Sequence, residues 1–174
     1  MLSSVLRFVR MPLLLVTIWA TIRFILGVAG VPYAPRGNAM FSLYSVMMLS
    51  CLYFGALSKN IAGFKWGGTI LTGVTIGAYS QILILLATVI SYAGNFNTSY
   101  FVHWDALNIK LAQLSPPISV ADALVHPEQV PLPPMAQALV GRALGIIING
   151  IIAGIFAVIG RALSGLAPKP ATQS

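Results

Sequence analysis

Charged residues are scarce in this chain, and acidic residues are the scarcest of them. Its 174 residues are 57% hydrophobic and 7% charged, with ten Lys and Arg but three Asp and Glu. Soluble domains carry about 25% charged residues, and thirteen charges cannot cover the surface of a soluble protein of this length. Lipid must therefore be the solvent for much of the surface, which predicts an all-α integral membrane protein.

Cysteine is nearly absent as well, since Cys51 is the single one. A disulfide within the chain, a CxxC redox pair and a thiolate-rich metal site are thereby excluded. The sequence pI is about 10.0, but no Lys/Arg run with interleaved aromatic residues is present. We therefore expect the basic residues to face lipid headgroups, and we expect no nucleic-acid partner.

Four apolar stretches are long enough to cross a bilayer, and they predict a four-transmembrane-helix bundle in one membrane domain, residues 1–174. Proline residues lie at the edges of these stretches or outside them, and Pro12 and Pro134 are placed as helix starts. The predicted spans are residues 11–31, 39–57, 66–93 and 135–162.

The basic residues predict the orientation of the bundle. With the N-terminus inside, six of them fall on the cytoplasmic side and three on the outer side, as the excess of Lys and Arg in cytoplasmic loops requires. Both termini are then cytoplasmic, and we expect a bacterial inner membrane. The cytoplasmic set is Arg7, Arg10, Lys59, Lys65, Arg161 and Lys169, and the outer set is Arg36, Lys110 and Arg142.

Residues 95–134 differ from the rest of the chain because they contain no glycine but all of its acidic and histidine residues. Trp104, Leu107, Leu111 and Leu114 recur at helical spacing and predict a short amphipathic helix. A second short helix is expected from Ser119 to a point before Pro127, with Asp122 in its first turn. We expect this segment to form an outer-side cap that carries His103, Trp104, Asp105, His126 and Glu128.

Arg23, Gln81 and Asn149 each lie near the middle of one of the predicted spans. A charge near the middle of a bilayer costs at least ~2.5 kcal/mol, so Arg23 needs carbonyls, hydroxyls, a lipid phosphate or another subunit. The three fall at similar depth and either hydrogen-bond between helices or line a polar pathway.

Glycine residues mark the faces through which the helices are expected to pack. Small-residue spacing of this kind lets backbones approach closely, but it does not say whether the neighbouring helix belongs to the same chain. The residues concerned are Gly73, Gly77, Gly141, Gly145, Gly150 and Gly154.

No catalytic or cofactor motif stands out, so we expect neither an enzyme nor a bound cofactor. His103, Asp105, Asp122, His126 and Glu128 would supply ligands for a metal on the outer surface, but no pair has helical ligand spacing, and we expect no metal site. Both histidines lie outside the spans, which excludes a haem held between transmembrane histidines.

Three roles fit these features. The first is a non-catalytic accessory subunit of a larger respiratory, photosynthetic or transport complex in the membrane. The second is a small homo-oligomeric channel or transporter with Arg23, Gln81 and Asn149 near its pathway. The third is a membrane protein that binds a ligand or pigment through aromatic residues and the outer histidines. The first and second both imply contacts with lipid and with other subunits or copies of the chain.

Overall fold

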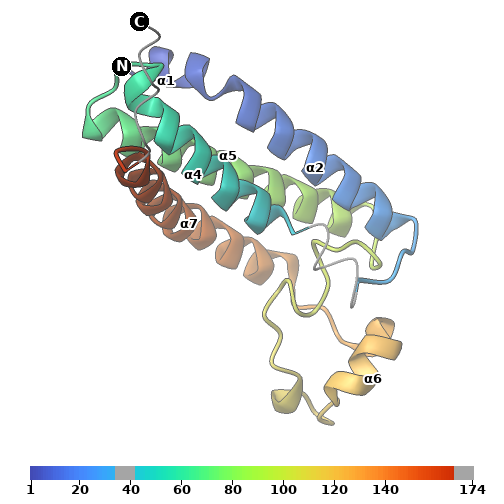
Figure 1. Ribbon diagram of the computed structural model, residues 1–174. Coiled ribbons are helices and arrows are strands. Elements are labelled where there is room, and N and C mark those ends of the chain that lie inside the picture. The colour runs from blue at the N-terminus through green and yellow to red at the C-terminus, as the bar shows by residue number, and fades with distance from the viewer. Residues whose placement is uncertain (34–41, 167–174) are drawn as a thin grey trace, which may run out of the picture.

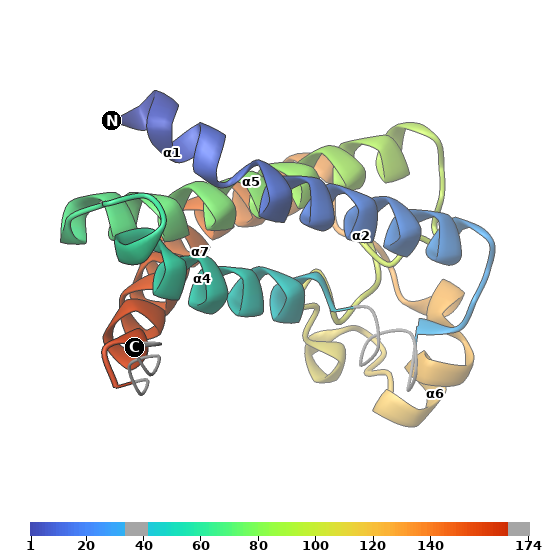
Figure 2. The same cartoon turned by 45° about the horizontal axis from the view of Figure 1, so that its top comes forward.

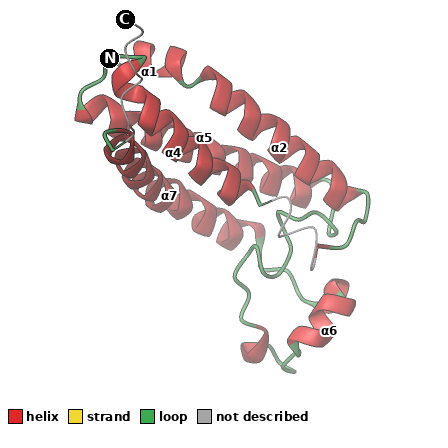
Figure 3. Cartoon of the chain, viewed as in Figure 1, coloured by secondary structure: helices red, strands yellow, loops and turns green. Residues whose placement is uncertain are grey.

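The computed structural model describes residues 1–33 and 42–166, and this part of the chain contains helices and loops but no strand (Figures 1 and 3). Arg36 and Lys169, used for the predicted orientation, and the first three residues of the predicted span 39–57 lie outside the described residues. The helices are α1 (Leu2–Phe8), α2 (Arg10–Val28), α4 (Leu43–Asn60), α5 (Trp66–Ala93), α6 (Val120–Val125) and α7 (Met135–Ser164), with short 3₁₀ turns at Leu111–Gln113 and Pro127–Gln129.

The four long helices lie side by side in an antiparallel bundle (Figure 1). α7 packs most extensively on α5 and then on α4, while α2 covers parts of α4 and α5. Figure 2 shows α1 and the end of α7 at one end of the bundle, with α6 at the other. Residues 95–134, which we call the connecting segment, therefore lie at the end opposite α1.

Three of the helices are long and apolar enough to cross a membrane: α2, α5 and α7. About a third or less of each apolar stretch is buried inside the protein, so most of its side chains face outward, as contact with lipid requires. The predicted spans 11–31, 66–93 and 135–162 correspond to these helices, and the bounds of α5 coincide with the prediction.

α4, which corresponds to the predicted span 39–57, is not among those three helices. It has 18 residues, and its sequence includes Ser45, Ser50, Ser58, Tyr44 and Tyr53 besides a polar end at Lys59 and Asn60. Ser50 and Ser58 are buried. α4 is thus the most polar of the four long helices.

Several hydroxyl groups inside the bundle bond to the backbone of their own helix. The side chains of Thr72, Thr75, Thr88 and Ser91 each donate to the carbonyl four residues earlier, at 2.7–2.9 Å. This back-bonding removes the cost of an unpaired polar group where water is absent. Helices rich in Thr and Ser can therefore pack without polar partners from neighbouring helices.

The connecting segment is only partly helical. The short helix predicted from Ser119 is present as α6, and the Ser119 hydroxyl accepts from the Asp122 backbone N–H. The amphipathic helix predicted over Trp104–Leu114 is wrong, because residues 100–108 form turns and Asn108 adopts a positive φ of 56°. A left-handed residue ends a helix, although Trp104 and Leu111 still pack in one apolar cluster.

The N-terminal residues before the first predicted span form a helix of their own. α1 is separated from α2 at Val9, and both Val5 and Val9 are fully buried. Phe8 contacts the rings of Phe54 and Phe64 edge-on, with centroids 5.4 and 5.5 Å away. α1 is therefore packed against the bundle rather than extended from it.

Candidate functional site

Arg23 points toward the end of the bundle that carries the connecting segment. It lies five residues before the end of α2 and is only 7% exposed. Its guanidinium carbon is 5.5 Å from the ring centre of Tyr33, 5.4 Å from that of Tyr100 and 5.9 Å from that of Phe101. Ring faces attract a cation at such distances, and the attraction grows when water is excluded.

The rings around Arg23 form one cluster, which we call the aromatic cluster: Tyr33, Tyr100, Phe101 and His103. Tyr33 stacks on His103 with ring centres 3.8 Å apart and meets Tyr100 edge-on at 5.3 Å. The Tyr100 hydroxyl donates to the Val31 carbonyl at 2.7 Å. These contacts join the end of α2 to the connecting segment, and the sequence offered no signal for them.

Burial sets the protonation states in the aromatic cluster. It lowers the pKa of His103 to about 4, with the charge of Arg23 acting in the same direction and Asp105 against it. Burial also raises the pKa of Tyr33 and Tyr100, opposed by Arg23. At neutral pH His103 is therefore uncharged, and its Nδ1 accepts from the Asp105 backbone N–H at 3.3 Å.

Arg142 reaches the aromatic cluster from α7. Its Nη2 donates to the Phe101 carbonyl at 2.8 Å, whereas its buried Nε–H has no hydrogen-bond partner among the described residues. Phe101 is thus contacted by one arginine from α2 and another from α7. The two arginines hold the connecting segment against the bundle.

Gln81 and Asn149 meet between α5 and α7. A side chain added at Gly145 would lie 3.2 Å from Gln81 Oε1 and 3.7 Å from Asn149 Nδ2, so both amides lie against this glycine. Asn149 Nδ2 donates to the Gly145 carbonyl at 3.0 Å. The structure therefore brings these two predicted residues together, while the guanidinium of Arg23 lies over the aromatic cluster.

The predicted glycine face of α5 packs against α7 of the same chain. A Cβ on Gly77 would lie 2.5 Å from Ala153 Cβ and 2.7 Å from the Asn149 carbonyl oxygen, and one on Gly73 would lie 2.8 Å from Ala157 Cβ. On α7, a Cβ on Gly150 or Gly154 would meet the side chain of Val74 at 3.9 or 3.2 Å. A Cβ on Gly141 would meet no atom within 4 Å. Gly141 is therefore free of helix packing.

Two further glycines, Gly55 and Gly160, make the closest helix contacts but belong to no repeated small-residue pattern. A Cβ on Gly55 would collide with the Ala157 carbonyl oxygen and one on Gly160 with the Leu52 carbonyl oxygen, both more closely than a Cβ on Gly73 or Gly77 would meet any atom. They let α4 and α7 touch backbone to backbone. Sequence reasoning missed them because each is a single glycine in an apolar run.

A second polar cluster, also missed, lies at the end of the bundle near α1. Arg161 donates to the Phe64 carbonyl at 2.8 Å and to the Thr69 hydroxyl at 2.7 Å. Its guanidinium lies 4.4 Å from the ring centre of Trp66, and Thr69 is 2.7 Å from the Ser58 hydroxyl. This network joins α7 to the turn between α4 and α5.

The acidic and histidine residues of the connecting segment are dispersed. His126 and Glu128 pair at 3.2 Å on the surface, while His103 lies in the aromatic cluster. Trp104 Nε1 donates to the Ala123 carbonyl at 3.2 Å and so attaches α6 to the turns. Within the described ranges, no three His, Cys, Asp or Glu side chains come together as metal ligands would.

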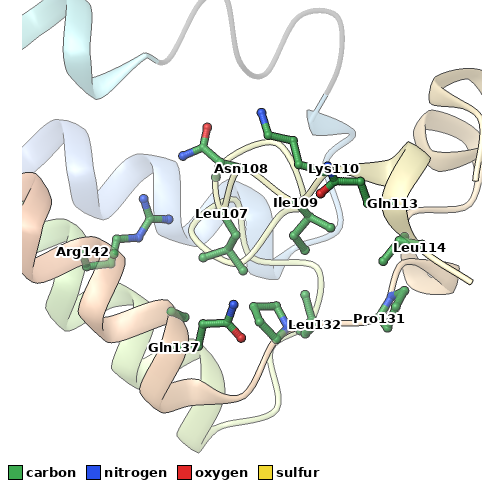
Figure 4. A pocket seen from close by; sticks show the side chains of 14 residues that line it. Leu107, Asn108, Ile109, Lys110, Gln113, Leu114, Pro131, Leu132, Gln137 and Arg142 are labelled. Atoms are coloured by element: carbon green, nitrogen blue, oxygen red, sulfur yellow. The ribbon is translucent and has the colours of Figure 1, made fainter. Parts of the chain in front are cut away.

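Three cavities are relevant to binding. The first, of about 580 Å³, lies between the connecting segment and the start of α7 (Figure 4). The second, of about 530 Å³, is an apolar groove between α2 and α4. The third, of about 360 Å³, adjoins His103 and Glu128. None of the three is lined by Arg23, Gln81 or Asn149.

A comparison of the chain with protein-family models, with curated proteins and with solved structures gives no match.

Proposed function

We propose that the chain is a non-catalytic accessory subunit of a larger complex in a bacterial inner membrane. In this proposal all four long helices span the bilayer, both termini are cytoplasmic and the connecting segment forms an outer-side cap. The distribution of charge supports the orientation: Arg7, Arg10, Lys59, Lys65 and Arg161 belong to the end near α1. An excess of basic residues is typical of the cytoplasmic side.

The observation that carries the proposal is the exposed face formed by α2 and α4. The groove between them is almost wholly apolar, and Tyr53 on its rim is 63% exposed. The groove is lined by Met11, Pro12, Leu15, Trp19, Val46, Leu49, Ser50, Tyr53 and Phe54.

The position of Tyr53 argues for a protein neighbour rather than lipid. It lies ten residues after the start of α4 at Leu43, about 15 Å along the helix and so near the middle of a bilayer of about 30 Å. Tyrosine is enriched at the membrane surfaces, and the Tyr53 hydroxyl has no hydrogen-bond partner among the described residues. A helix laid in the groove would cover the ring and supply an acceptor.

The polarity of α4 points the same way. α4 falls outside the set of helices apolar enough to cross a membrane by themselves. A helix of this kind spans more readily when protein covers its sides. The α5–α7 side of α4 is already covered within the chain, so the α2–α4 groove is the face left for a partner.

The test is native mass spectrometry of the full chain extracted gently from its own membrane, in wild-type form and as two tryptophan variants. Leu49→Trp fills the groove, and Ile151→Trp adds the same bulk to the exposed face of α7, where Ile151 is 59% exposed. We expect different subunits to co-purify at fixed stoichiometry with the wild type and Ile151→Trp but not with Leu49→Trp. A homo-oligomer without other subunits would contradict the proposal.

The channel alternative requires Arg23, Gln81 and Asn149 to share one water-filled cavity in an assembly of identical chains. It remains a prediction without a supporting observation, because Gln81 and Asn149 lie against Gly145 between α5 and α7. Conductance through a homo-oligomer that Arg23→Leu alters would favour it.

A further inference from the structure

The 580 Å³ cavity at the start of α7 differs from the other two in its charge. Lys110 and Arg142 line it together with the amides of Asn108, Gln113 and Gln137. No Asp or Glu is among the described residues that line it. The cavity therefore carries two positive charges and several N–H donors, with no carboxylate to balance them.

One wall of the cavity is apolar. Leu107, Ile109 and Leu132 point into the space between Gln137 and Arg142 on one side and Gln113 on the other (Figure 4). Gly141 adds free volume beside Arg142, since a Cβ there would meet nothing within 4 Å. The cavity thus has room for a group that is anionic at one point and apolar beside it.

The hydrogen bonding of Arg142 suits it to bind an anion. Its Nη2 is held by the Phe101 carbonyl at 2.8 Å, which fixes the guanidinium, while its Nε–H is buried without a partner in the described part of the chain. An unpaired buried donor on a cation is costly unless a ligand accepts from it. A guanidinium with free N–H groups suits phosphate oxygens in particular.

The depth of the cavity fits a lipid headgroup. Gln137 lies in the first turn of α7, and Arg142 lies seven residues after Met135, about 10 Å along the helix. If α7 begins at the membrane surface, the cavity lies where headgroups meet acyl chains. The first turn of α7 also contains no acidic residue, so the positive end of this long helix is not neutralised there.

We propose that this cavity binds the phosphate of a ligand whose net charge is negative, with Arg142 and Lys110 as its cationic partners. The apolar wall accommodates the part of the ligand next to the phosphate, as in an anionic phospholipid. The inference requires α7 to cross the membrane but does not require the chain to have protein partners. Lipid binding at this cavity and the accessory-subunit role can therefore be tested independently.

The test measures lipid binding to the purified full chain by native mass spectrometry, with phosphatidylglycerol as the anionic probe and phosphatidylcholine as the zwitterionic one. Lys110→Gln removes one charge from the cavity, and Lys59→Gln removes one from an exposed site at the other end of the bundle. We expect Lys110→Gln to weaken phosphatidylglycerol binding about fivefold, the contribution of one basic residue near an anionic surface. Lys59→Gln and phosphatidylcholine binding should change little.

A second variant tests the space rather than the charge. Gly141→Leu fills the cavity at a position with no neighbours within 4 Å, so it should leave folding intact while phosphatidylglycerol binding falls. Lys110→Arg should restore binding that Lys110→Gln loses. Equal effects of Lys110→Gln and Lys59→Gln would overturn the proposal, because they would mean general attraction to anionic lipid.

A soluble probe identifies the source of the phosphate. Inorganic phosphate at millimolar concentration is added to the same complex. If the lipid occupies the cavity through both its phosphate and its apolar part, phosphate alone should not displace it from the wild type. Displacement of the lipid by inorganic phosphate that depends on Lys110 would assign the cavity to a soluble phosphate ester. If neither phosphatidylglycerol nor inorganic phosphate binds in a way that depends on Lys110, the proposed site is refuted.

Discussion

Alanine substitutions at two glycines of the bundle should have opposite effects on stability. A Cβ on Gly55 would lie 2.6 Å from Ala157 Cα and 2.7 Å from its carbonyl carbon, whereas a Cβ on Gly141 would meet nothing within 4 Å. Carbon atoms in contact are normally about 3.5–4.0 Å apart. Gly55→Ala therefore forces α4 and α7 about 1 Å apart, and Gly141→Ala forces nothing.

The expected magnitudes follow from this geometry. Overpacking a helix interface costs about 1–3 kcal/mol, and Gly55 belongs at the upper end because backbone atoms cannot move aside by changing rotamer. Replacing a helical glycine by alanine contributes up to about 1 kcal/mol in favour of folding. Gly55→Ala should therefore lower the free energy of unfolding by about 2 kcal/mol, while Gly141→Ala should raise it by up to about 1 kcal/mol.

The assay is reversible unfolding of the purified chain in mixed micelles, followed by far-UV circular dichroism. A compensating substitution makes the test sharper. Gly77→Ala collides first with Ala153 Cβ at 2.5 Å, so Ala153→Gly should recover part of its loss. Ala157→Gly should not rescue Gly55→Ala, because that collision is with backbone atoms. Equal stability of Gly55→Ala and Gly141→Ala would refute the reasoning.

Three further predictions concern the two ends of the bundle. Burial lowers the pKa of His103 from 6.5 to about 4, so the unfolded chain binds the proton at a higher pH than the folded protein. Stability should therefore fall by roughly 2–3 kcal/mol as the pH drops from about 6.5 toward 4, and thermal melts of His103→Phe should lose this dependence. Tyr100→Phe removes the bond to the Val31 carbonyl and should cost about 1 kcal/mol in the same unfolding assay. Arg161→Gln removes the bonds to Phe64 and Thr69, so hydrogen exchange should accelerate in residues 58–66, with Arg7→Gln as the control that changes nothing there.

The sequence predicted the long helices well because their signal is local. The bounds of α5 coincide with the apolar run 66–93, and α7 begins after Pro134 as expected. The face of Gly73 and Gly77 was also readable, since four-residue spacing in an apolar helix favours close packing. That its neighbour is α7 of the same chain required the structure.

The features that could not be predicted depend on backbone conformation or on contacts between distant residues. Helical spacing over Trp104–Leu114 was misleading because Asn108 turns the chain with a positive φ, which the pattern of apolar residues does not reveal. Likewise, Tyr100 and Phe101 are more than seventy residues away from Arg23 in sequence. The assembly of the aromatic cluster is therefore a tertiary property.

The three arginines in these contacts differ in a way that separates structural from binding roles. The guanidinium of Arg23 is covered by three rings, and Arg161 combines two hydrogen bonds with a ring face at 4.4 Å. Each attaches a connecting region to a helix end. Arg142 also bonds the connecting segment, yet its Nε–H is unpaired in the described structure and it lines a positively charged cavity. Because an unpaired buried donor is unfavourable, Arg142 is the arginine for which we propose a ligand.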